Sequence, residues 1–441
     1  MLQSSTRFVI CSVGSYGDVF PFVLLSKRLT NLGYKVSFIT LQAHEDLVTA
    51  AGIDFSPFGT SDQYYSVMND SDLWSPLIGF KTIWERLMMP NRLVIREFLS
   101  SIDSKENVVI ITHPLAFPLA DLARTERIGQ LKVVCAYLSP MIIRTNYEDL
   151  PLGPLRIPKW APNFFLHFIW SWLDKIFFYD PIFIPELNKD RVRLGMQAVD
   201  GFISHLQNDS DFYIGLFPDW FARRQVDWPT NFQIGGFLLH ESKGECLDVE
   251  LREFLENGEQ PVVFTFGSEN WHADRHFEFA LAALRSLGRR GVFLYKKGLN
   301  IPVQDAKQII ARSFAPLDLL LPQCSAIVHH GGIGTMAHSI YYAIPQLVIP
   351  MAWDQWGNAL RIEKLGIGIS LPSSRLNSKL LAKNLNKLLN DVAIAKNVQR
   401  YSQQMRSDIS LNMLVDNMLK MICLYEQPTP RVEEHSVSDQ H

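Results

Sequence analysis

Apolar and polar positions follow one another along the chain in a pattern that predicts strands alternating with helices. Phe8–Val13 is a short apolar run, Gly14–Asp18 is a polar turn, and Val19–Leu32 carries apolar residues at helical spacing before Gly33. Short apolar runs of this kind are typical of strands buried in a parallel sheet. Further strands are expected at residues 34–40, 108–112 and 133–138. The pattern predicts an α/β protein with a doubly wound sheet.

The second half repeats this scheme. A strand is expected at 261–266, a helix at 277–287 and a strand at 291–295, and the Pro- and Gly-containing stretch 227–236 is the expected linker. A chain of 441 residues is long enough for two cores. We therefore expect domains at 1–230 and 231–405, a last helix at 406–425 that returns to the first domain, and a disordered polar tail at 426–441.

Composition excludes several classes of protein. The net charge of −3 provides no basic surface for nucleic acid. The five cysteines are dispersed and contain no C-x-x-C pair, which indicates buried thiols in a reducing compartment and neither a disulfide framework nor a zinc site. The first strand is too short for the core of a signal peptide, and no apolar run reaches the ~20 residues of a spanning helix. We expect a cytoplasmic protein, and we consider peripheral contact with the inner membrane.

The most informative segment is a glycine-rich turn at residues 329–335, His-His-Gly-Gly-Ile-Gly-Thr. It follows the apolar run Ala326–Val328, which reads as a buried strand, and it precedes a helical stretch at 336–343. Amide groups at the start of a helix point outward and favour anions, and glycines let a bulky anion come close to the backbone. The segment therefore predicts a phosphate site.

The sequence around this turn strengthens the prediction. Upstream lies Phe314-Ala315-Pro316, and downstream a second strand at 344–350 is bracketed by prolines. Polar residues follow it in Trp353–Ala359. Open α/β sheets bind ligands at the carboxyl ends of their strands, so these polar groups are expected at the same site.

The block from Phe314 to Gly368 resembles the donor-sugar signature of GT-B glycosyltransferases, which use nucleotide-diphosphate sugars. That resemblance implies two Rossmann-like domains facing a cleft. It implies that Phe314 stacks on the nucleobase, that Ala315 binds it through the backbone, and that Asp354 and Gln355 bind sugar hydroxyls. The diphosphate would be held by the glycine-rich turn, and Ser268 after Phe266-Gly267 matches the Phe-Gly-Ser turn near it. The residues implied for the diphosphate are His329, His330, Gly332, Gly334 and Thr335. His338 stands where plant members carry a ribose-binding glutamate, so the choice between UDP and dTDP stays open.

Two residues that follow strands of the first domain are candidates for catalysis. Asp18 could simply cap a helix, a common role. Sugar transfer also needs a base to take the acceptor's proton, and in similar bacterial enzymes the aspartate of this Gly-Asp pattern is the proposed base. We favour catalysis for Asp18. His113 follows the strand 108–112 and is either an auxiliary base or acceptor contact, or a structural histidine.

Two Asp-x-Asp triplets, 70–72 and 209–211, could suggest a divalent metal site, but neither follows a strand, and we interpret them as turns. Because helix N-termini and imidazoles already face the diphosphate, we expect no metal. We also expect no cofactor beyond the nucleotide sugar, which is a co-substrate.

Residues 160–183 concentrate aromatic side chains in the first domain. The segment could be a core-packing helix, the wall of a lipophilic acceptor pocket, or a face that lies on a membrane. Phe168 and Trp172 are the candidate acceptor contacts. The ten aromatics are Trp160, Phe164, Phe165, Phe168, Trp170, Trp172, Phe177, Phe178, Tyr179 and Phe183.

Within the GT-B family, several stretches are similar to the bacterial rhamnosyltransferases of rhamnolipid synthesis. They are residues 17–22, 184–188, 194–195, 216–222, 227–229 and 331–334. The resemblance implies an inverting hexosyltransferase that uses dTDP-L-rhamnose and a 3-(3-hydroxyalkanoyloxy)alkanoate to make a glycolipid biosurfactant. UDP-glucose as donor is the alternative. A catalytically silent scaffold is disfavoured because the base and the phosphate histidines are present, and a nucleotide-sugar epimerase is disfavoured by the lipophilic segment.

Overall fold

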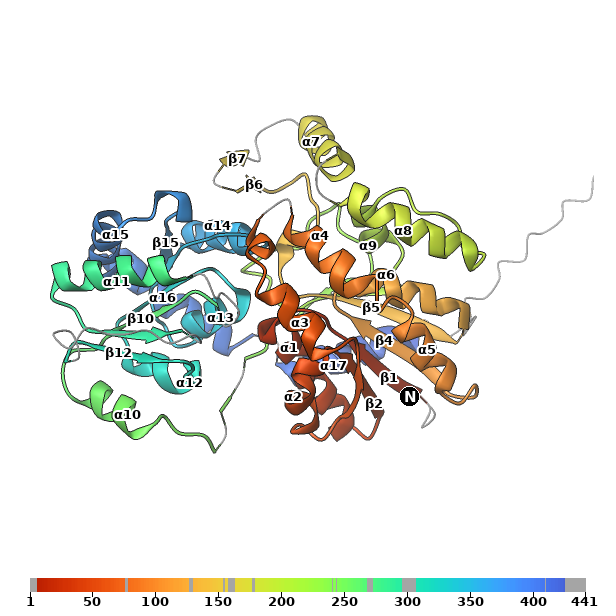
Figure 1. Ribbon diagram of the computed structural model, residues 1–441, viewed down its shortest axis with the longest axis horizontal. Helices are drawn as coiled ribbons and strands as arrows, with labels where there is room; N and C mark the ends of the chain where they lie inside the picture. The colour runs from red at the N-terminus through yellow and green to blue at the C-terminus, as the bar shows by residue number, and fades with distance from the viewer. Residues whose placement is uncertain are drawn as a thin grey trace, which may run out of the picture.

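The computed structural model describes residues 6–75, 78–126, 130–153, 155–157, 163–176, 179–239, 241–242, 244–267, 273–295, 307–408 and 410–424. Two lobes lie side by side, each built around a parallel sheet (Figure 1). The fold class expected from the sequence, two Rossmann-like domains that face each other, is confirmed.

The N-terminal sheet has the order β3-β2-β1-β4-β5-β8-β9, and every neighbouring pair is parallel. Because β1 is flanked by β2 and β4, its carboxyl end lies at the point where the strand order reverses, where α/β sheets open a crevice. The strands are β1 (Thr6–Cys11), β2 (Lys35–Thr40), β3 (Asp54–Pro57), β4 (Asn107–Thr112), β5 (Leu131–Tyr137), β8 (Phe212–Gly215) and β9 (Phe232–Ile234).

The C-terminal sheet has the order β12-β11-β10-β13-β14-β15 and is also parallel throughout. Here β13 lies between β10 and β14, so the turn that follows β13 opens at the second crevice. The strands are β10 (Val262–Thr265), β11 (Gly291–Leu294), β12 (Ile309–Arg312), β13 (Ala326–His329), β14 (Gln346–Val348) and β15 (Gly368–Ser370); β6 (Leu150–Leu152) and β7 (Leu155–Ile157) form a separate antiparallel pair.

Helices cover both sheets. In the first domain they are α1 (Tyr16–Asn31), α2 (Glu45–Thr49), α3 (Ser61–Met68), α4 (Gly79–Ile83), α5 (Val94–Ser101), α6 (Phe117–Leu122), α7 (Asn163–Ile176), α8 (Asp180–Arg193) and α9 (Phe202–Asn208). The later helices are α10 (Val249–Glu256), α11 (Asp274–Leu287), α12 (Leu317–Leu320), α13 (Ile333–Tyr341), α14 (Gln355–Leu365), α15 (Ser378–Asn390), α16 (Val392–Arg406) and α17 (Leu411–Leu424). In the described part of the chain, no helix combines the length and the apolar character needed to cross a membrane.

The expected linker at 227–236 contains a strand. β9 pairs with β8 at the edge of the N-terminal sheet, so this sheet ends at Ile234, a few residues beyond the expected boundary at 230. The strand is only three residues long and lies among polar and proline residues, which hides it from the hydrophobic pattern.

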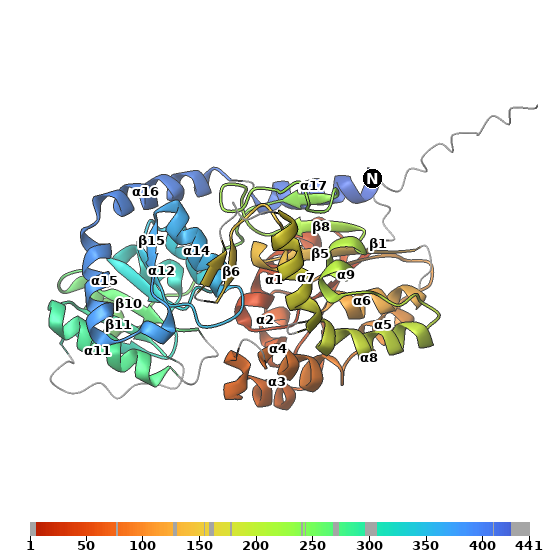
Figure 2. The same ribbon diagram turned by 90° about the horizontal axis from the view of Figure 1, so that it is seen from above.

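The last helix, α17, crosses back to the first domain. α15 and α16 cover the second sheet, whereas α17 lies along the first domain (Figure 2). Leu414 and Met418 of α17 share a buried cluster with Phe22 and Leu25 of α1. Burial of these side chains stabilises the pairing of the two domains by the hydrophobic effect.

Candidate active site

The glycine-rich turn begins at His329, the last residue of β13, which is fully buried. The Gly331 N–H donates to Nδ1 of His329 (3.1 Å), so Nε2 carries the proton and donates to Oε1 of Gln346 (3.0 Å). Burial lowers the pKa of His329 to about 3, which keeps the ring neutral. Both ring nitrogens therefore hold the turn in place, and this geometry favours a positioning role over direct contact with a donor.

The ring of His330 packs closely against the backbone of Gly267 and Gly332. A Cβ atom at Gly332 would lie 2.6 Å from its Nε2, and one at Gly267 would lie 3.4 Å from its Cε1, so a side chain at Gly332 would displace the ring. Within the described residues, the buried Nδ1 has no hydrogen-bond partner. Burial lowers the pKa of His330 to about 4, although the backbone carbonyl of Thr265 favours the charged form. A buried, unpaired nitrogen beside a helix start is suited to a polar ligand.

The helix start itself is open to a ligand. Gly331 has φ +99°, a left-handed conformation that favours glycine, and Gly332 is the N-cap of α13. The first helical hydrogen bond runs from Met336 N to Gly332 O (3.0 Å), so the amides of the first turn lack intrahelical partners. A Cβ atom at Gly334 would meet nothing within 4 Å. The first turn of α13, which includes the half-buried Thr335, can therefore receive an anion.

The other candidate donor-binding residues differ in exposure and in their contacts. Phe314 is 65% exposed after β12, so its ring is free to stack on a planar group, and Ala315 is buried beside it. Nδ1 of His338 donates to the Gly334 carbonyl (2.9 Å), a contact within α13. Ser268 lies outside the described residues, so its predicted contact stays a prediction.

Asp354 and Gln355 lie where β14 leads into α14. Gln355 is buried, and its Oε1 accepts from the amides of Met351 (2.9 Å) and Ala352 (3.1 Å), which fixes the loop. Burial raises the pKa of Asp354 to about 6. The negative charge of Asp18 raises this pKa further, whereas the hydrogen bond from Asn358 lowers it. Perturbed carboxylates of this kind are common in functional sites.

Asp18 lies in the first turn of α1 and forms a capping box with Ser15. Its Oδ2 accepts from the Ser15 amide (2.7 Å) and the Ser15 hydroxyl (2.8 Å). Within the described residues, Oδ1 has no hydrogen-bond partner, and the side chain is half-buried. Asp18 therefore does help to cap α1, through Oδ2. Its Oδ1 stays available to a substrate hydroxyl.

His113 directly follows β4 and is buried, and its Nδ1 accepts from the Leu115 amide (3.3 Å). Burial lowers the pKa of His113, and the negative charge of Asp18 opposes this. Asp18 thus acts electrostatically on His113 in its own domain and on Asp354 in the other. The three side chains, which come from α1, the end of β4 and the start of α14, share one site between the domains.

The aromatic segment is divided between an exposed helix face in α7 and the core, where Phe183 of α8 is buried. In α7, Phe164 is 77% exposed and Phe168 is 63% exposed, and Phe165 and Trp172 are also exposed. These side chains recur at the spacing of one helix face, and α7 stands out from the body of the first domain beside β6 and β7 (Figure 1). Leu166 on the opposite face is buried. Trp160, Phe177 and Phe178 lie outside the described residues.

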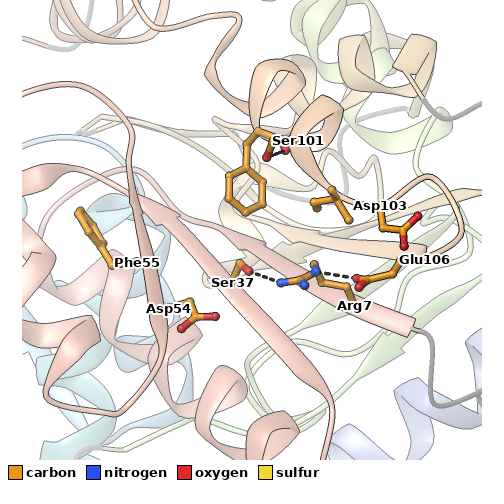
Figure 3. A pocket seen from close by; sticks show the side chains of 9 residues that line it. Arg7, Ser37, Asp54, Phe55, Ser101, Asp103 and Glu106 are labelled. Atoms are coloured by element: carbon orange, nitrogen blue, oxygen red, sulfur yellow. Dashed lines mark hydrogen bonds and ion pairs between the residues drawn. The ribbon is translucent and has the colours of Figure 1, made fainter.

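A cavity of about 460 Å³ lies at the amino-terminal ends of the strands of the N-terminal sheet. There Arg7 bridges the Ser37 hydroxyl and Glu106 (Figure 3). Glu106 also pairs with Lys35. These hydrogen bonds lower the pKa of Glu106 to about 2. The cavity is lined by satisfied ion pairs at the amino-terminal ends of the strands, so we do not assign the site to it.

The Asp-x-Asp triplets serve local structure. Asp70 caps a short 3-10 helix by accepting from the Asp72 amide (2.9 Å). Asp211 accepts from the Val133 amide (2.7 Å), and Asp209 from His205 (2.6 Å), before the start of β8. Both triplets are part of turns or caps, as the sequence predicts.

Two family models match the chain. Residues 8–98 match the glycosyltransferase family 28 N-terminal domain, and residues 303–421 match the C-terminal domain of proteins like erythromycin biosynthesis protein CIII. The first match includes Asp18, and the second includes the glycine-rich turn. The chain is a GT-B glycosyltransferase. Such enzymes transfer a sugar from a nucleotide sugar.

Relatives of this glycosyltransferase differ in their acceptors. The chain is 25% identical to the O-mycaminosyltylonolide 6-deoxyallosyltransferase of Streptomyces fradiae, covering 91% of this chain and 94% of the relative. It is 26% identical to a sterol 3-beta-glucosyltransferase of Arabidopsis thaliana (87% and 63%) and 25% to that of Komagataella phaffii (96% and 34%), so it spans only part of the sterol enzymes.

Solved structures share the fold of this glycosyltransferase. The glycosyltransferase of kitacinnamycin matches 94% of this chain and 99% of its own, with a TM-score of 0.70 and 16% identity. The glycosyltransferase VinC, solved in complex with dTDP, matches 94% and 99%, with a TM-score of 0.67 and 17% identity.

Sequence reasoning missed one residue of this glycosyltransferase site. Asn358 is fully buried and donates to both the Gly331 carbonyl (2.9 Å) and Asp354 (2.9 Å). Its position four residues after Asp354, one helical turn away, was the available signal.

Proposed function

We propose that the protein transfers L-rhamnose from dTDP-L-rhamnose to the hydroxyl of a lipid such as a 3-(3-hydroxyalkanoyloxy)alkanoate, giving a glycolipid. UDP-glucose as donor to a similar lipid is the second candidate. The exposed aromatic face of α7 is the observation that supports a lipophilic acceptor, because a contiguous apolar patch on the surface is typical of binding sites. Relatives named for sterol glucosylation fit such an acceptor, and one named for 6-deoxyallosyl transfer fits a deoxysugar donor.

In this proposal Oδ1 of Asp18 accepts the proton of the acceptor hydroxyl as its oxygen attacks the anomeric carbon. The bond from that carbon to the diphosphate breaks on the opposite face, so the configuration inverts. The developing charge on the leaving diphosphate is stabilised by the first turn of α13 and by His330. Asp354 holds a sugar hydroxyl. His113, on which the charge of Asp18 acts, is the auxiliary base or a contact to the acceptor in this proposal.

The test is a matrix of donors and acceptors. Purified protein is incubated with dTDP-L-rhamnose or UDP-glucose and with hydroxyalkanoyloxyalkanoates of several chain lengths, and products are read by mass spectrometry. We expect a deoxyhexose added to the long-chain lipid. A hexose from UDP-glucose alone selects the second candidate. Transfer only to a polar acceptor contradicts the lipid proposal.

A further inference from the structure

The side chain of Asn358 joins three segments that are far apart in the sequence. Its amide nitrogen donates to Gly331 O (2.9 Å) and to Oδ2 of Asp354 (2.9 Å). Its Oδ1 accepts from the Ser139 hydroxyl (3.2 Å), which follows β5 in the first domain. Both amide hydrogens and the amide oxygen are therefore used, at a position with no exposed surface.

These segments have different tasks in the site described above. Gly331 belongs to the glycine-rich turn, Asp354 is the candidate sugar ligand, and Ser139 belongs to the first domain. We propose that Asn358 is a positioning residue that sets Asp354 against the donor sugar and makes this placement depend on contact with the first domain. The inference rests on the proposed sugar-binding role of Asp354.

The residue before Asp354 is also held by the first domain. Trp353 has φ +60°, a strained conformation for a side chain of this size, and such strain persists only where the surroundings enforce it. Its ring packs edge-to-face against Phe80 with centroids 4.3 Å apart. A Cβ atom at Gly79 would lie 2.9 Å from the Trp353 ring. Asp354 is thus fixed from both sides by contacts that cross the domain interface.

Other contacts dock α14 on the same segment of the first domain without touching Asp354. Lys364 pairs with the buried Asp149 (2.7 Å). Gly357 lies so close to Met141 that a Cβ atom would lie 2.8 Å from its sulfur. The pair Lys364–Asp149 therefore offers a control in which the interface is weakened and the amide network is kept.

Removal of the Asn358 amide should change the pKa of Asp354, whereas weaker packing of α14 on the first domain should not. The charged groups that act on Asp354 are Asp18 from α1 and Arg361 from α14, and both remain in the variant. The N–H of Asn358 favours the ionised carboxylate, so its loss raises the pKa of Asp354 further. In a plot of kcat/KM for the donor against pH, the acid limb should then move to higher pH.

The experiment compares Asn358→Ala and the milder Asn358→Ser with Lys364→Ala. Steady-state rates are measured with the donor varied from pH 5 to 9, and thermal unfolding is followed in parallel. A lost hydrogen bond to a charged group predicts a fall of roughly ten- to hundredfold in kcat/KM for the donor, with an acid limb shifted upward by about one pH unit. Lys364→Ala should change neither. Ser139→Ala should also move the acid limb upward, because the Ser139 hydroxyl favours the ionised form of Asp354 as well.

Two results would overturn the inference. One is a folded Asn358 variant whose donor kinetics and acid limb match the wild type; the other is a Lys364→Ala variant that reproduces both effects. If the wild type transfers no sugar, the proposed function fails. The inference is then tested by itself, by measuring the unfolding stability of the variants as a function of pH. The stability gained by Asp354→Asn should then begin near pH 4, the unfolded-state pKa, in both the wild-type and the Asn358→Ser backgrounds, and its upper pH limit should lie higher in Asn358→Ser. An unchanged pH range would overturn it.

Discussion

Replacing Asp18 with asparagine separates the two roles that the structure allows for this residue. The side chain caps α1 through two hydrogen bonds to Oδ2, and it offers Oδ1 toward the site. Asparagine keeps the shape and one acceptor but cannot take a proton. Loss of a general base predicts a fall in turnover of roughly 10²–10⁴, while weakened capping predicts a loss of about 1 kcal/mol in stability.

Ser15→Ala is the matched control because it removes the hydroxyl half of the cap and keeps the carboxylate. We expect a similar loss of stability, with turnover within a few-fold of the wild type. Rates are measured as release of nucleoside diphosphate with both substrates saturating, and stability by thermal unfolding. Turnover of Asp18→Asn within a few-fold of the wild type would rule out its role as base. An equal fall in Ser15→Ala would assign the effect to the cap.

Four further predictions follow from the geometry. His330→Ala should weaken binding of a nucleoside diphosphate by roughly ten- to hundredfold and of the monophosphate much less, and equal losses in calorimetry would show that His330 does not contact the β-phosphate. Asp354→Asn should stabilise the protein at pH 7 by at most about 3 kcal/mol, because a pKa near 6 in the folded state exceeds the unfolded value; the gain should vanish near pH 4, and a gain independent of pH would contradict the raised pKa. Transfer should survive EDTA, because the helix start and His330 stabilise the leaving diphosphate, and a loss that magnesium reverses would refute this. Phe168→Ser should raise KM for long-chain acceptors only and leave thermal stability nearly unchanged, with Val392→Ser, at a still more exposed apolar residue, as control; unchanged acceptor kinetics would exclude α7 from acceptor binding.

The sequence predicts the parts of the fold that local patterns encode. Buried parallel strands such as β1 and β4 are continuous apolar runs, and the glycine-rich turn follows β13 where the pattern places it. The strand β9 is too short to produce such a pattern. Position at a strand end was enough to bring Asp18 and His113 to one site, because parallel strands end at the same edge of a sheet.

Side-chain direction and contacts between domains are not encoded locally. The sequence could not tell whether the aromatics of α7 pack inward, because its outer and inner faces are both apolar, and the structure exposes Phe164 and Phe168. It could not show that His329 turns away into the sheet toward Gln346. Nor could it pair Asn358 with Ser139, which is 219 residues away.

The anomeric configuration of the product tests the central claim most directly. Purified protein is given an anomerically pure nucleotide-diphosphate sugar and the lipid acceptor, and the one-bond carbon–hydrogen coupling at the anomeric carbon is read by NMR during the reaction. A single displacement with Asp18 as base predicts a glycolipid of opposite configuration from its first appearance. A product that retains the donor's configuration would contradict the account.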